Sequence, residues 1–75
     1  MQIFHNVYTF GQLTVLIDRI AKENGGIESD ATDNRRYVAK DRFVRRVRYA
    51  NGKTNSFYAN IHDGGLRISG VVMML

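Results

Sequence analysis

Arginine is the residue type with the clearest chemical potential in this sequence. Eight of the eleven cationic side chains are arginine, and residues 35–53 hold eight cations against the single acid Asp41. That segment therefore carries a net charge of +7, whereas the whole chain carries +4. A guanidinium group binds phosphate or carboxylate through two parallel hydrogen bonds, which lysine cannot reproduce. The arginines predict an anionic partner, with a solvated basic surface as the alternative.

A second possible chemistry is acid–base catalysis at His62. With Arg46, Tyr58 and Arg67 nearby, its imidazole would act as a general base beside phosphate-binding cations, as in a small ribonuclease. However, His62 is followed by Asp63 and glycine, an order typical of a tight turn. No second base or nucleophile is expected beside it. We therefore predict a protein that is not an enzyme and keep a small ribonuclease as a remote alternative.

Metal and cofactor sites are not expected. The chain has no cysteine and only two histidines, which excludes disulfides and cysteine-based zinc sites. In the acidic segment 27–34, Asp30 and Asp33 lack the spacing and number of a calcium-binding loop. The longest apolar run, residues 71–75, is too short for a membrane span. The first residues lack a charged segment followed by an apolar one, so no signal peptide is expected. The expectation is a cytoplasmic protein with no cofactor, metal or membrane partner.

The length of the chain limits how these side chains can be positioned. It has 75 residues, 44% of them hydrophobic and 24% charged, which is typical of one small globular domain spanning residues 1–75. A core of this size contributes only about 3–5 kcal/mol, so a domain without disulfides or metals often depends on a partner or a second copy.

One helix is predicted over residues 10–23. Thr9 and Gln12 have the spacing of a capping box. Asn24 and two glycines follow the segment and are expected to end the helix. Apolar side chains recur on one face at Leu13, Leu16, Ile17 and Ile20.

Strands are predicted on both sides of this helix. β-branched and aromatic residues indicate four of them, over residues 2–8, 42–50, 55–61 and 66–74. The acidic segment 27–34 is predicted to be a loop. Segment 34–50 also fits a helix, but cationic residues interrupt its apolar face, so strand is favoured. The expected fold is α+β, with one helix packed on a three- to four-stranded antiparallel sheet in the order βαβββ.

The hairpin registers decide which side chains face the helix. A three-residue loop after Ala50 places Phe43 opposite Ile61, and a turn centred on residues 63–64 places Ile61 opposite Leu66. A two-residue first loop would pair apolar with polar residues and is not favoured. In the favoured registers the core face carries Phe43, Val47, Phe57, Ala59, Ile61, Leu66, Ile68, Val72 and Met74.

The opposite face of the sheet gathers arginines around an aromatic ring. Cations with an aromatic among them can neutralise phosphates, stack on a base and hydrogen-bond to sugars or base edges. Arg45 is the exception, because the register turns it inward beside Ala59. The residues predicted to bind nucleic acid or a partner are Arg42, Arg46, Arg48, Tyr58, Asn60 and Arg67.

An apolar strip is predicted beyond these arginines. The register points Val71, Met73 and Leu75 outward on an edge strand, where soluble monomers expose few apolar side chains. A second copy of the chain would cover this oligomer interface and make a homodimer. The N-terminal strand is the alternative cover.

Two functions fit these features. The first is a small basic protein that binds nucleic acid, or a complex that handles nucleic acid, through its arginines. The second is an inhibitor or adaptor that docks on an acidic or nucleic-acid-handling protein complex, with its apolar strip at the centre of the contact. Small cysteine-free domains without catalytic motifs also occur among phage-encoded inhibitors of host enzymes, including anti-CRISPR proteins. That class shares no motif, so the comparison names a kind of protein and no family.

Overall fold

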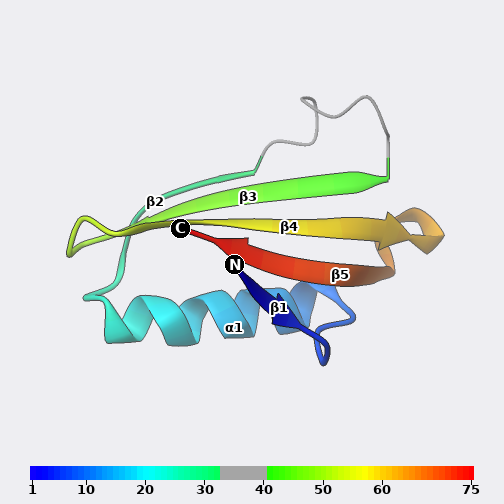
Figure 1. The fold of residues 1–75 in the computed structure, drawn as a ribbon, viewed down its shortest axis with the longest axis horizontal. Helices are drawn as coiled ribbons and strands as arrows, with labels where there is room; N and C mark the ends of the chain where they lie inside the picture. The colour runs from blue at the N-terminus through cyan, green and yellow to red at the C-terminus, as the bar shows by residue number, and fades with distance from the viewer. Residues whose placement is uncertain (33–40) are drawn as a thin grey trace.

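Over residues 1–32 and 41–75, which the computed structural model describes, the protein has one α-helix and five β-strands (Figure 1). The strands form one antiparallel sheet in the order β1-β5-β4-β3-β2. This is the predicted α+β class, with one strand more than the largest number predicted. The elements are β1 (Gln2–Phe4), α1 (Phe10–Glu23), β2 (Ile27–Thr32), β3 (Arg42–Tyr49), β4 (Thr54–His62), the 3-10 helix η1 (Asp63–Gly65) and β5 (Arg67–Met74).

Local sequence signals set both ends of α1. The Thr9 side chain accepts a hydrogen bond from the Gln12 N–H (3.1 Å), and Gln12 Oε1 accepts one from the Thr9 N–H (3.2 Å). At the other end the Gly26 N–H donates to the Ala21 carbonyl (2.8 Å), and Gly25 and Gly26 both have positive φ, a conformation that favours glycine. The predicted capping box and the bounds 10–23 are confirmed.

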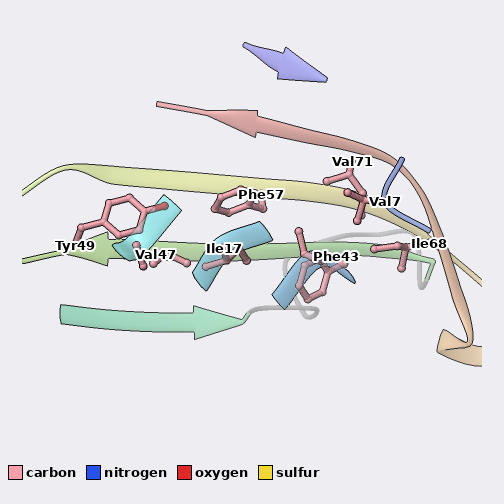
Figure 2. Close-up of a cluster of buried hydrophobic side chains, with 11 residues drawn as sticks. Val7, Ile17, Phe43, Val47, Tyr49, Phe57, Ile68 and Val71 are labelled. Carbon is pink, nitrogen blue, oxygen red and sulfur yellow. The ribbon is translucent and has the colours of Figure 1, made fainter. Parts of the chain in front are cut away.

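The apolar side of α1 covers one face of the sheet (Figure 1). Figure 2 shows Ile17 of the helix among Val47 and Phe57 of the central strands, and all three are fully buried. At the start of the helix the rings of Phe10 and Phe43 meet edge to face with their centroids 4.9 Å apart. The buried residues of α1 are Leu13, Ile17 and Ala21. An antiparallel sheet needs only one such covered face, and its other face can meet solvent or a ligand.

The predicted loop over residues 27–34 is wrong, because β2 occupies most of it and pairs with β3 at the edge of the sheet. Asp30 accepts a hydrogen bond from Arg45 (Nε to Oδ1, 2.8 Å), and Glu28 lies 3.4 Å from Arg48. Opposite charges across neighbouring strands stabilise their pairing. The charges that suggested a loop therefore have basic partners on β3, which inspection of segment 27–34 alone does not show.

The other strands match their predicted segments with small changes of length. β3, β4 and β5 each differ from the prediction by one residue at one or both ends. The helical alternative is therefore wrong over residues 42–49, and the earlier part of that segment, residues 34–40, lies outside the described residues. β1 ends at Phe4, well short of the predicted residue 8, and Val7 beyond it is buried in the core.

Both hairpin registers differ from the predicted ones. The first loop starts one residue earlier than predicted, so Phe43 lies opposite Ala59 instead of Ile61. Each partner is displaced by two residues, and side chains therefore keep their predicted face. In the second hairpin Ile61 pairs with Ile68, and Leu66 lies in the turn with 77% of its surface exposed. Leu66 is therefore not a core residue.

A β-bulge interrupts the pairing of β4 with β5. The register shifts between Tyr58 and Asn60, where Gly70 and Val71 together lie opposite Ala59. Gly70 has φ +60°, the left-handed conformation that glycine supplies in such bulges. One extra residue on β5 reverses which of its later side chains point toward the helix.

This reversal overturns the predicted oligomer interface. Val71 is fully buried and Met73 packs against the core, whereas Val72 and Met74, which were predicted in the core, turn toward the other face. β1 pairs with β5, so β5 is not an edge strand (Figure 1). Of the three predicted residues only Leu75, at the C-terminus, is exposed. The homodimer was predicted from an exposed apolar strip, and the structure does not expose that strip.

Tyr49 offers a test of the buried core. Its side chain is fully buried, and its hydroxyl has no hydrogen-bond partner within the described part of the chain. Burial, and secondarily the charge of Asp30, raises the pKa of Tyr49 above its ordinary value. The folded state thus holds the phenol proton more tightly than the unfolded state. Its contribution to stability is complete below about pH 10 and is lost as the pH rises through the higher folded-state pKa.

We expect Tyr49→Phe to unfold at an unchanged or slightly higher denaturant concentration at pH 7, because the lost hydroxyl is unsatisfied. Above about pH 10 the variant should lose less stability than the wild type. Denaturant titrations at several pH values measure both effects. Tyr8→Phe, at a residue that is 56% exposed, is the matched control. Equal alkaline loss in wild type and Tyr49→Phe would contradict the assignment.

Candidate nucleic-acid interface

The face of the sheet opposite α1 carries all six side chains predicted to bind a partner. Odd-numbered residues of β3 and β4 point toward the helix, so the even-numbered ones point away from it. Arg67 of β5 pairs with His62 and lies on the same face. We call this set of residues the arginine face: Arg42, Arg46, Arg48, Tyr58, Asn60 and Arg67.

The neighbours within the arginine face differ from those predicted. Arg46 was expected opposite Tyr58, but Arg46 lies opposite Ser56 and Tyr58 lies opposite Val44. Arg42 and Arg46 are instead the diagonal neighbours of Tyr58, a separation that long side chains can span. In the register of the sheet, Tyr58 is therefore flanked by two arginines of β3.

Three arginines of β3 are exposed, and they differ in whether they form an ion pair. Arg48 forms an ion pair with Glu28 at 3.4 Å, both side chains being more than half exposed. Among residues 1–32 and 41–75, Arg42 and Arg46 form no ion pair. Exposed ion pairs contribute about 0–1 kcal/mol, so an incoming phosphate can displace Glu28 from Arg48 at little cost. Arg67 at the far end of the face is paired with Asp63 at 2.5 Å.

An apolar band crosses the same face and was missed by the sequence prediction. Ile3 of β1 pairs with Val72, Val72 pairs with Tyr58, and Tyr58 pairs with Val44, so four strands contribute one row. Ile3 is 49% exposed and the others are half-buried. The signal that would have revealed the band is Gly70 inside a predicted strand, because a lone glycine there is typical of a bulge.

Arg45 points inward, as predicted, and holds the sheet edge to the helix. Its guanidinium donates to both carboxylate oxygens of Asp30 and, at 3.4 Å, to the Thr14 hydroxyl of α1. The hydrogen bonds to Asp30 raise the pKa of Arg45 above its ordinary value. Its cross-strand neighbour is Phe57 and not the predicted Ala59. Arg45 is therefore a structural residue and lies outside the arginine face.

His62 has a neighbour that was not expected. Its Nε2 lies 2.6 Å from the Ser69 hydroxyl, and these two residues with Tyr8 and Arg67 line a hollow of about 250 Å³. A hydrolytic pair of this kind also needs a third group that orients the imidazole. The Asp63 carboxylate, the nearest acid in sequence, binds Arg67 instead. The His62–Ser69 contact joins the ends of β4 and β5 at the second hairpin turn.

Neither metal-binding groups nor membrane-spanning helices within residues 1–32 and 41–75, nor similar proteins, indicate a function for the arginine face, so its function is inferred from the chemistry of its side chains. No group of three or more metal-binding side chains occurs in the described segments. None of their helices is long and apolar enough to cross a membrane. Comparisons with protein-family models, curated proteins and solved structures find no match.

Proposed function

We propose that this protein is a small cytoplasmic, non-enzymatic binding protein whose arginine face engages nucleic acid or a complex that handles nucleic acid. The observation that supports this most directly is the row of exposed Arg42, Arg46 and Arg48 on one strand beside the ring of Tyr58. Arginine neutralises phosphates, and the half-buried ring of Tyr58 offers a stacking surface for a base.

The dimensions of this row suit a nucleic-acid strand. Residues 42 and 48 are six apart on β3, which at about 3.3 Å per residue separates them by about 20 Å. A stacked strand rises about 3.4 Å per nucleotide, so the row would span about six nucleotides. Of the two acidic side chains of β2, Asp30 lies on the helix side bound to Arg45, and Glu28 forms only an exposed ion pair with Arg48, which a phosphate can displace.

A protein target is the second candidate, and the apolar band favours it. Ile3 and Met74 are 49% and 44% exposed on the same side of the sheet as the arginines. Protein interfaces often combine an apolar centre with arginine. On this alternative the protein is an inhibitor or adaptor, of the phage or anti-CRISPR kind, that docks on a host complex.

Titration of labelled single-stranded and duplex oligonucleotides at two salt concentrations tests the proposal. With three phosphate contacts on a single strand, affinity should fall about twenty-fold between 50 and 200 mM salt. Arg46→Ala should flatten the slope of log K against log salt by about 0.7 on single strands and 0.9 on duplex. Ser29→Ala, on the same face of neighbouring β2, is the control. No salt-dependent binding at 50 mM salt would refute the nucleic-acid function and leave the protein target.

A further inference from the structure

The arginine face is not flat at the bulge of β5. A hollow of about 270 Å³ opens there between the middle strands of the sheet. It exists because Gly70 has no side chain: a Cβ at this position would lie 3.2 Å from Asn60 Nδ2. The residues that line it are Arg42, Phe43, Tyr58, Ala59, Asn60 and Gly70.

The groups around the hollow match the surfaces of a nucleobase. Tyr58 offers an aromatic ring on which a base can stack. The Asn60 amide has a donor and an acceptor side by side, as needed to hydrogen-bond the edge of a base. Arg42 lies directly opposite Asn60 and can bind the phosphate of the same nucleotide. Stacking surface, base-edge partner and phosphate partner thus surround one space.

The second hollow of the molecule provides a useful comparison. There the polar groups already bind one another, since His62 contacts Ser69 and Arg67 contacts Asp63. Around Gly70, by contrast, neither Tyr58 nor Asn60 makes a side-chain hydrogen bond to any other part of the described chain. Within residues 1–32 and 41–75, their hydrogen-bonding groups therefore have no partner that a ligand would have to displace.

We propose that the hollow at Gly70 binds one unstacked base of a single-stranded nucleic acid, held by Tyr58 and Asn60. This inference rests on the proposed function and adds to it a position where the protein contacts a base. The bulge has two consequences. It turns Val71 into the core, and it places Gly70, which has no side chain, on the arginine face, where the hollow opens. Adenine occurs in both DNA and RNA, so single strands of either kind should bind in the hollow.

The test compares an oligoadenylate of a dozen nucleotides with an abasic strand of equal length, as DNA and as RNA. The abasic strand keeps the phosphates and lacks the bases. The wild type should bind the oligoadenylate about 5- to 150-fold more tightly, the range expected for one stacked base. Tyr58→Leu should remove most of that preference, because the stacking surface is lost, and leave the salt dependence unchanged. Ser56→Ala, two residues away on the same face, should change neither.

Filling the hollow is an independent route to the same result. Gly70→Asn adds a side chain, and asparagine tolerates positive φ better than most residues other than glycine. It should abolish the preference for bases, with circular dichroism confirming the fold. If it does not fold, Tyr58→Leu alone decides. Equal, salt-dependent binding of both strands by the wild type would overturn the base site and leave the proposed function intact. Binding of neither strand would overturn both.

Discussion

Replacing Phe57 by alanine is expected to lower the free energy of unfolding by about 3–5 kcal/mol. Phe57 lies on β4, the central strand of the sheet, and none of its surface is exposed. Truncation would leave a cavity between the sheet and Ile17 of the helix (Figure 2). Because a domain of this size has only a few kcal/mol of stability, the variant should be largely unfolded at 25 °C. Denaturant titration followed by circular dichroism measures the loss.

Leu66→Ala is the matched control, because its side chain is also large and apolar but is 77% exposed in the second hairpin turn. The sequence-based register places it in the core, whereas the structure predicts a change within about 0.5 kcal/mol. A loss of several kcal/mol at Leu66, or a stable Phe57→Ala, would contradict the arrangement of β4 and β5.

Replacing Arg42, Arg46 and Arg48 together by alanine is expected to remove most binding to single strands. Three lost phosphate contacts should flatten the slope of log K against log salt by about 2 and weaken affinity roughly 100-fold or more at 50 mM salt. Their side chains point away from the core, so folding should be retained. Fluorescence anisotropy at several salt concentrations measures the slope.

Arg45→Ala tests whether binding depends on the net charge of the protein or on the arginines of the arginine face. It removes the same charge from the same strand, but its side chain bridges Asp30 and Thr14 on the helix side. It should lower stability by about 1–3 kcal/mol, because it leaves a partly buried carboxylate without its partner. The salt slope of the folded fraction should stay as in the wild type. If Arg45→Ala flattened the slope as much as Arg46→Ala, net charge and not the arginine face would govern binding.

Much of the fold follows from short-range signals in the sequence. The helix is delimited by Thr9 and Gln12 at one end and by Gly25 and Gly26 at the other, all within a few residues of the groups that they cap. Such interactions do not depend on the rest of the chain, so residues 10–23 could be predicted to the residue. The strand segments over residues 42–74 were likewise visible in their composition and turns.

The facing of β3 and β4 was also predictable, although their register was not. Side chains alternate with a period of two, so a displacement of each partner by two residues keeps Arg46 and Tyr58 on the outer face. The six residues of the arginine face could therefore be named from the sequence, while their neighbours could not. Binding by those residues remains a prediction.

The sequence alone determined the helix, the three later strands and the side of the sheet on which the arginines lie. Tertiary structure decided three further features: the strand β2, the bulge at Gly70 and the pairing of β1 with β5. Each depends on contacts between distant segments. The charges of β2 are offset by β3, and the one-residue shift at Gly70 sets Gly70 and Val71 opposite Ala59 and buries Val71. A lone glycine in the β5 segment indicates a bulge, but local propensity does not specify which residues lie opposite it, so the hollow at Gly70 depends on how β4 and β5 pair.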